Sequence, residues 1–106
     1  IYMASSKEYL NFILEQLDDL ENIKYRAMMG EYILYYNDKI VGGIYDDRLL
    51  VKPVQSALDY VSNIEYSLPY PGAKEMLLIT EVDDKEYLAG LFKTVLAELP
   101  AKKVKK

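Results

Sequence analysis

The sequence predicts an α+β fold: an antiparallel meander sheet of about five strands, with an N-terminal, a short middle and a C-terminal helix packed on it. Two patterns carry this prediction. Near both ends of the chain, apolar residues recur at intervals of three to four, which is typical of amphipathic helices. Between the ends, short apolar-rich segments are separated by turn-forming residues, which is typical of neighbouring antiparallel strands. A length of 106 residues fits one domain, and we expect that domain to span residues 1–101.

The first helix is expected to start at Ser5, because Ser5 and Glu8 have the spacing of a capping box. In such a box, each side chain accepts a hydrogen bond from a free backbone N–H of the first turn. The apolar face of this helix carries Leu10, Ile13, Leu14, Leu17 and Leu20. Asn22 is expected to end it. Three acids crowd its carboxyl end, where the helix dipole disfavours negative charge, so packing must hold the helix in place. These acids are Asp18, Asp19 and Glu21.

Four strands are expected to follow as a meander. They cover residues 23–29, 31–36, 40–45 and 48–52 and are rich in Tyr, Ile, Val and Leu. Gly30 is expected to supply a kink or a positive φ between the first two strands. Gly42 and Gly43 would weaken the third strand, so we expect a bulge or a close backbone approach there.

The second half of the chain predicts two more helices and one or two strands. Pro53 ends the fourth strand and suits the first turn of a short helix that extends to Val61. Residues 62–72 are expected to form a loop, or an edge strand at most, and residues 75–80 a central strand. Asp83 and Glu86 repeat the capping-box spacing before the last helix, which Pro100 is expected to close.

Composition excludes several classes of function. The chain has no cysteine, so disulfides, thiolate metal sites and cysteine nucleophiles are excluded, and no histidine, the commonest general base. We therefore expect no cofactor and no enzymatic activity. Apolar runs are too short to span a membrane, and the first residues lack the layout of a signal peptide. These features predict a cytoplasmic protein without a membrane segment.

Charge is unevenly distributed along the chain. Four of the thirteen basic residues stand in residues 102–106, so residues 1–101 carry nine basic against seventeen acidic residues. Such an acidic body repels polyphosphate, which argues against DNA binding by the folded part. The basic segment, residues 102–106, is expected to be a disordered tail that could make weak phosphate contacts.

Tyrosine is the one unusual component, with eleven copies. Tyrosine combines a large apolar body with a polar hydroxyl, which suits half-exposed surfaces and protein interfaces. Both faces of the second strand are apolar, so the strand is either covered on both sides or contacts another molecule. The residues expected at such an interface, in a homodimer or with a partner protein, are Tyr32, Tyr35, Tyr36 and Tyr45.

Acidic and basic side chains of the meander have structural explanations first. Asp46 and Asp47 stand between two strands, where Asp favours turn geometry. With Glu31 they could instead form a weak divalent-cation site. Arg26 is expected to pair with a carboxylate across the sheet, and Arg48 with the Asp46–Asp47 turn.

The segment from residue 26 to residue 52 resembles a known family. It reads R-x-M-M-G, then an aromatic-rich strand, then D-D and an aliphatic run that ends in Lys. This pattern is similar to the amino-terminal domain of the TfoX/Sxy competence-regulator family. The residues that carry the resemblance most strongly are Arg26, Met28, Gly30, Tyr32, Leu34, Tyr35, Asp46, Asp47, Leu49 and Lys52.

The resemblance implies a bacterial regulatory setting and a secretion-chaperone-like α+β fold. Larger members of the family act with a cyclic-AMP receptor protein at promoters and carry a second domain, which this chain is expected to lack. The family offers no catalytic residues to carry over. The resemblance therefore implies a stand-alone domain with no enzymatic role.

Three hypotheses for function remain open from the sequence. The leading one is a cytoplasmic, non-enzymatic regulatory or adaptor domain that acts through protein contacts, with a partner or with a second copy. The alternative is a nucleic-acid-associated competence regulator whose basic tail contacts phosphates. The third is a small metal-dependent enzyme that uses Glu31, Asp46 and Asp47.

Overall fold

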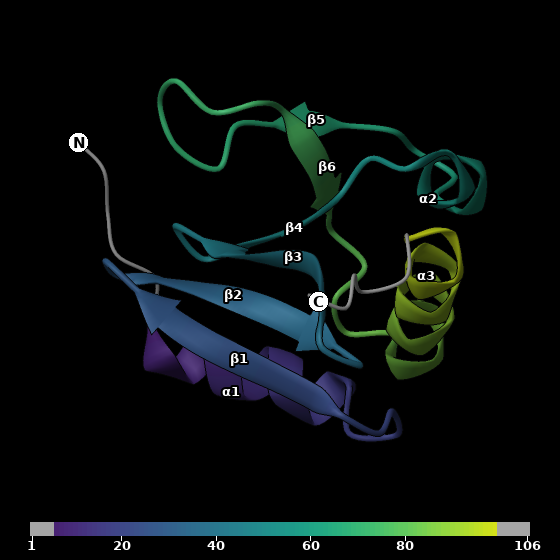
Figure 1. The fold of residues 1–106 in the computed structure, drawn as a ribbon, viewed down its shortest axis with the longest axis horizontal. Coiled ribbons are helices and arrows are strands. Elements are labelled where there is room, and N and C mark those ends of the chain that lie inside the picture. The colour runs from purple at the N-terminus through teal and green to yellow at the C-terminus, as the bar shows by residue number, and fades with distance from the viewer. Residues whose placement is uncertain (1–5, 100–106) are drawn as a thin grey trace, which may run out of the picture.

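The computed structural model describes residues 6–99 and has the predicted α+β fold (Figure 1). Its elements, in chain order, are α1 (Lys7–Gln16), β1 (Ile23–Met28), β2 (Glu31–Tyr36), β3 (Lys39–Tyr45), β4 (Arg48–Val51), α2 (Gln55–Tyr60), β5 (Tyr66–Ser67), β6 (Met76–Ile79) and α3 (Lys85–Glu98). The expected closure of the last helix by Pro100 and the expected disordered tail, residues 102–106, lie outside the described residues.

All six strands form one antiparallel sheet in the order β1-β2-β3-β4-β6-β5. The four-strand meander is confirmed, and each of its three connections is a two-residue turn. Both residues of every turn have positive φ, as a type I′ hairpin requires. β6 lies between β4 and β5, as expected for a central strand, and β5 is the short edge strand that the sequence left as an alternative to a loop.

A single hydrophobic core lies between the helices and one face of the sheet. Figure 1 shows α1 running behind β1 and β2, while α2 and α3 lie side by side at one end of the sheet. The helices contribute to it Leu10, Ile13, Ala57, Leu88, Leu91, Phe92 and Val95. The strands contribute Leu34, Tyr36, Val41, Ile44, Leu49, Val51, Leu77 and Ile79. Each large side chain buried in this way contributes about 2 kcal/mol to folding.

The helix starts are displaced by one residue from the sequence prediction. Ser6, rather than Ser5, caps α1, with its Oγ accepting from the Tyr9 N–H at 3.1 Å. Likewise Asp84, rather than Asp83, caps α3 and accepts from the Tyr87 N–H at 3.1 Å. Each position offers two adjacent residues able to cap, so the spacing to the next glutamate does not decide which of them does.

Two other boundaries also differ from the prediction. α1 ends at Gln16, and the chain turns through the following residues, so that Asn22, with φ 65°, begins the approach to β1 instead of ending the helix. α2 begins at Gln55 after the cap residue Val54, which leaves Pro53 in the connection before the helix. In both places, residues that the sequence pattern assigned to a helix lie in the connection next to that helix.

Gly42 is the point of closest backbone approach in the sheet. The pairing of β2 with β3 shifts register between Leu34 and Tyr35, which is the predicted bulge. A Cβ on Gly42 would lie 2.7 Å from the Val51 Cα and would overlap the Leu50 carbonyl oxygen. Since these atoms belong to the backbone of β4, they cannot move aside without separating the strands.

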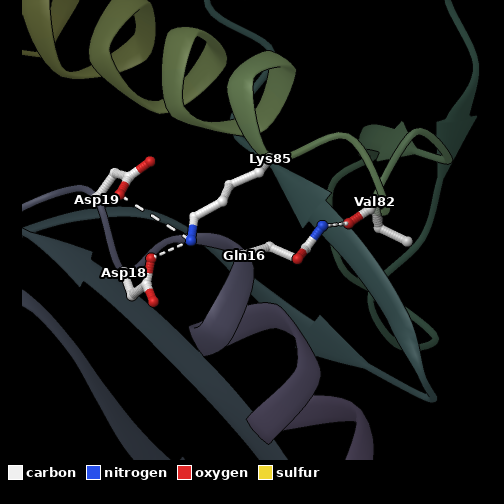
Figure 2. A network of polar contacts seen from close by, with 5 residues as sticks. All are labelled: Gln16, Asp18, Asp19, Val82 and Lys85. Atoms are coloured by element: carbon white, nitrogen blue, oxygen red, sulfur yellow. Dashed lines mark hydrogen bonds and ion pairs between the residues drawn. The ribbon is translucent and has the colours of Figure 1, made fainter.

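The acids after α1 pair with the first residue of α3 (Figure 2). Lys85 Nζ lies 2.5 Å from Asp18 Oδ1 and 4.0 Å from Asp19 Oδ1. Beside this ion pair, Gln16 Nε2 donates to the Val82 carbonyl oxygen at 2.9 Å. A negative charge at a helix C-terminus and a positive charge at a helix N-terminus are each unfavourable alone, and here they neutralise one another.

Glu98, in the last turn of α3, caps the N-terminus of α2. Val54, the cap position of α2, offers no side-chain acceptor. Instead, Glu98 Oε1 accepts from the Ser56 N–H at 2.6 Å and Glu98 Oε2 from the Gln55 N–H at 3.3 Å. Hydrogen bonds from Ser56 and then Gln55 lower the pKa of Glu98. The carboxylate thus links the last turn of α3 to the first turn of α2.

Replacing Gly42 by Ala should lower the free energy of unfolding by about 3 kcal/mol, because the new methyl group overlaps the backbone of β4. Urea unfolding followed by circular dichroism would measure it. Gly90→Ala in α3 is the matched control, since its Cβ meets only the end of the Tyr60 side chain. The gain in helix propensity should offset part of the cost of moving the Tyr60 hydroxyl from the Tyr87 carbonyl, so a loss at Gly90 as large as at Gly42 would contradict the assignment.

Stability should fall between about pH 5 and pH 3 partly through Glu98. Its folded-state pKa is lowered, so the ionised carboxylate stabilises the fold above the unfolded-state pKa. That contribution is lost as the pH falls through the folded-state pKa. Glu98→Gln should therefore be less stable than the wild type at pH 6, with the difference shrinking at pH 3 in urea titrations. Glu65→Gln, an exposed glutamate outside the helices, controls for the change in net charge, and an equal effect there would refute the cap.

Candidate functional site

The two faces of the sheet have different surroundings. Along β2, Leu34 and Tyr36 point into the core, whereas Ile33 and Tyr35 point to the opposite face and belong to no core cluster. The ladder continues this second face across the sheet, because Ile33 pairs with Gly43, Gly43 with Leu50, and Leu50 with Leu78. Residues paired directly across strands share a face.

We call this second surface the open face, since every helix of the described chain packs on the other side. Its residues are Lys24, Arg26, Met28, Glu31, Ile33, Tyr35, Ile40, Gly43, Tyr45, Arg48, Leu50 and Leu78, and Lys52 follows Leu50 by alternation along the strand. Leu50 is fully buried, while Ile33, Tyr35, Tyr45 and Leu78 are partly exposed. The open face is therefore an apolar surface that other side chains of the protein cover only in part.

The four tyrosines predicted at an interface divide between the two faces. Tyr36 is buried in the core and Tyr32 packs against it, with its ring edge-on to Tyr25 at a centroid distance of 5.9 Å. Only Tyr35 and Tyr45 of the four stand on the open face, so Tyr36 is not available to a partner. Alternation along β2 separates Tyr35 from Tyr32 and Tyr36, but it does not reveal which face of the sheet the helices cover.

Tyr45 is held in place by a glycine beneath its ring and a tyrosine beside it. A Cβ on Gly43 would lie 2.8 Å from Tyr45 Cε2, so the ring lies against the backbone of its own strand. The ring of Tyr70, in the loop between β5 and β6, is 6.4 Å away. Burial raises the pKa of Tyr45, with further contributions from the nearby Glu31 and Tyr70. Tyr45 is therefore a neutral, fixed aromatic platform.

A shallow hollow of about 540 Å³ opens next to this platform. It is lined by Met28, Met29, Glu31, Tyr70 and Pro71. Three of these side chains are exposed apolar groups: Met28 at 42%, Met29 at 91% and Tyr70 at 48%. We call this the hairpin hollow, because the β1–β2 hairpin forms one wall and the β5–β6 loop forms the other.

Met29 is in an unusual backbone conformation for its residue type. It occupies the first turn position of the β1–β2 hairpin with φ 52°, where Asn, Asp or Gly is normally found. The left-handed conformation costs an ordinary side chain about 1–2 kcal/mol. No burial compensates for this cost, because the side chain is almost completely exposed. Strain of this kind at an exposed apolar residue points to a role outside folding.

The charged residues singled out from the sequence have structural contacts. Arg48 Nε donates to the Tyr45 carbonyl oxygen at 3.1 Å, and its Nη1 donates to Ser67 Oγ, so the expected pairing with the Asp46–Asp47 turn is wrong. The turn brings the Tyr45 carbonyl oxygen, and not the carboxylate of Asp46 or Asp47, within hydrogen-bond distance of the Arg48 guanidinium. Arg26 is exposed, and none of the described carboxylates forms the expected ion pair with it.

Asp46 and Asp47 serve the turn, as the structural explanation predicted. Both have positive φ, and Asp47 Oδ1 accepts from the Ser6 N–H at 2.8 Å, which ties the β3–β4 turn to the start of α1. Among residues 6–99, no three acidic side chains come together as a ligand group for a metal. The structure therefore does not support the divalent-cation site with Glu31. Nor is any helix in the described part of the chain long and apolar enough to cross a membrane.

Residues that sequence reasoning missed are Met29, Tyr70 and Pro71. Met29 carried a signal that could have been used, since a methionine directly before glycine in a two-residue turn must adopt a positive φ. Tyr70 and Pro71 carried none, because only the folding of the β5–β6 loop brings them near the β1–β2 hairpin.

Fold and surface together define a small α+β domain with a one-sided sheet, whose candidate site is a half-exposed aromatic surface. The chain belongs to the family of the TfoX N-terminal domain, which matches residues 15–89. All the residues that carried the resemblance lie inside this range.

A relative of similar length supports this assignment. The chain is 33% identical over 105 residues to the "Uncharacterized 12.7 kDa protein in trpE 5'region" of Spirochaeta aurantia, covering 98% of this chain and 91% of that protein. No solved structure matches the chain. The expected secretion-chaperone-like fold therefore stays a prediction beyond the α+β architecture itself.

Met29→Asn should raise the free energy of unfolding by about 1 kcal/mol, because asparagine tolerates the left-handed conformation that methionine does not. Urea unfolding would measure the change. Met28→Asn is the control, since Met28 is also exposed and apolar but lies within β1. A loss of stability in Met29→Asn would show that the methionine side chain supports the fold, and would remove the argument from strain.

Proposed function

We propose that this chain is a non-enzymatic, cytoplasmic regulatory or adaptor domain that acts through protein contacts made by the open face and the hairpin hollow. The observation that carries the proposal is the one-sided sheet. Its helices bury one face, while the other keeps apolar side chains partly exposed and adds Met28, Met29 and Tyr70 at its margin.

The composition of this surface supports a protein partner. Tyrosine and methionine are enriched at protein interfaces because they bury a large area at low entropic cost or adapt their shape. Tyr45 is already fixed by Gly43 and Tyr70, so little conformational freedom would be lost on binding. Met29 costs stability where it stands, which is expected of a residue retained for contact with another molecule.

The available chemistry supports a non-enzymatic role. The chain has neither histidine nor cysteine, and two acids of the neighbouring turn have other tasks. Asp47 binds the start of α1, and Asp46 forms the turn. Family membership supports a regulatory setting. The absence of cysteine agrees with a reducing compartment.

A second candidate function, nucleic-acid association, is favoured by one observation. Arg26 stands on the same face as Tyr35, and Lys52 lines the same surface hollow as Tyr45, an arrangement in which bases could stack on rings beside a cation. Against it, the chain as a whole carries a net charge of −4, which repels phosphates at a distance. A protein partner is therefore the stronger hypothesis.

The proposal predicts selective loss of partners when the hollow is changed. The wild type and a Met29→Asn/Tyr70→Ser double variant would be immobilised and exposed to a nuclease-treated bacterial lysate. Phe12→Ser, which removes a 36% exposed ring from α1 on the helical side, is the matched control. We expect a protein retained by the wild type and the control to be lost by the double variant, by at least about tenfold in a titration with the purified partner.

Different outcomes would redirect the function. Retention of the same proteins by all three forms would exclude the hairpin hollow as the contact surface. A complex that forms in an untreated lysate but not in the nuclease-treated lysate would favour the nucleic-acid hypothesis. Light scattering on the purified wild type and double variant would show whether the partner is a second copy. A homodimer that forms through this surface should dissociate in the double variant.

A further inference from the structure

Within residues 6–99, β1 leaves one row of its backbone groups without a partner strand. It is the outermost strand of the sheet, pairs only with β2 among the described strands, and has five exposed residues in a row, 24–28. The Asn37 N–H donates to the Asn22 carbonyl oxygen at 3.1 Å. Since bonded and non-bonded pairs alternate in an antiparallel ladder, Ile23, Tyr25 and Ala27 direct their N–H and C=O groups away from β2.

A largely apolar groove of about 570 Å³ lies beside the first half of this edge, between β1 and α1. Its apolar walls come from Leu14, Leu17 and Leu20 within and after α1, and from Ile23 and Tyr25 on β1. Asp18, which is paired with Lys85, and Asn22 and Lys24 add polar groups to the lining. Lys7 lies over the Tyr25 ring, with Nζ 5.4 Å from its centre. A strand laid beside β1 would place the side chains next to Ile23 and Tyr25 into this groove.

The other side of the same edge is basic. Lys24 and Arg26 stand on the open face of β1, opposite Tyr35 and Ile33. Lys24 has one loose ion pair, with Asp38 at 3.9 Å, and its side chain remains 69% exposed. A strand laid beside β1 would place its remaining side chains next to these two cations.

We propose that a protein partner adds a strand to the β1 edge, and that this strand alternates apolar with acidic residues. This inference rests on the proposed function, in that it assumes a protein partner, and it adds the mode of recognition. The backbone groups of Ile23, Tyr25 and Ala27 supply the hydrogen bonds, as in other cases of strand addition. The groove takes the apolar side chains, and Lys24 and Arg26 take the acidic ones.

The same charges disfavour a second copy of this chain as the occupant. In an antiparallel pair of β1 strands centred on Tyr25, Lys24 of each copy would stand opposite Arg26 of the other. Directly opposed like charges destabilise a strand pair, and charged edge strands are a known device against self-association. An acidic strand turns the same two residues into an attraction.

Three labelled peptides of about ten residues test the proposal by fluorescence anisotropy with the full chain. One alternates Leu with Glu, the second Leu with Lys, and the third Ser with Glu. We expect the Leu–Glu peptide to bind at least about tenfold more tightly than the other two. The Lys24→Glu/Arg26→Glu variant should reverse the preference between Glu and Lys. Equal binding of the acidic and basic peptides would overturn the proposed partner chemistry.

Backbone pairing is tested by blocking one amide on the protein. The N–H of Ala27 points away from β2, so Ala27→Pro removes a donor at the free edge without removing a bond between β1 and β2. We expect this variant to keep its circular dichroism spectrum and to lose the Leu–Glu peptide. Unchanged peptide binding by Ala27→Pro would overturn strand addition.

Should Ala27→Pro fail to fold, methylation of the peptide provides the same test with the wild type. Methyl groups on one set of alternate peptide nitrogens should abolish binding, and methyl groups on the other set should not. Equal effects of both sets would overturn strand addition. Tighter binding of oligothymidylate than of the peptide would also overturn strand addition by a protein partner. A wild-type dimer that Ala27→Pro converts to a monomer would show that the occupant is a second copy.

These outcomes separate the inference from the proposed function. A partner captured through the hairpin hollow but retained by Ala27→Pro would leave the adaptor role in place and remove only the strand addition. A Leu–Glu peptide that is lost by Ala27→Pro but retained by Met29→Asn/Tyr70→Ser would support the edge site. A lysate partner retained by that double variant would remove the hollow.

Discussion

One-sided burial of the sheet is the constraint on which the rest of the structure depends. The chain forms a single core, in which Leu34, Leu49 and Leu77 of three strands pack with Ile13 and Phe92 of the helical layer. A six-stranded sheet has two faces, and the described helices cover one of them. The second face therefore combines aromatic side chains with partial exposure, which makes it the candidate site.

Charges that would be unfavourable within their own helices make the polar links of the helical layer. Lys85 begins α3 and Glu98 ends it, so both oppose the dipole of that helix. Lys85 meets Asp18 after α1, and Glu98 meets the free N–H groups of α2. Each charge thus links its helix to a neighbouring element at the surface, while burial in the shared core keeps the three helices on one face of the sheet.

The sequence was sufficient for the fold and insufficient for the site, for a physical reason. Strand bounds depend on local alternation and turn residues, so β2 matches its predicted range and the other meander strands differ from theirs by one residue at most at either end. The predicted caps were wrong by one residue where two equivalent residues stood side by side, as at Asp83 and Asp84. The site was harder to predict, because alternation separates Tyr35 from Tyr36 without showing which of them the helices cover. The approach of distant segments, such as that of the Tyr70 loop to the β1–β2 turn, leaves no local pattern at all.

The two-residue turns of the meander have a consequence for the order of folding. Closing such short loops costs little chain entropy, so pairing among β1, β2, β3 and β4 can form early from contacts close in sequence. The pairing of Leu49 with Ile79 closes a much longer loop, and α3 follows β6 in the chain. During synthesis the meander is therefore complete before the last helix exists, and its core face stays exposed to other chains until α3 arrives.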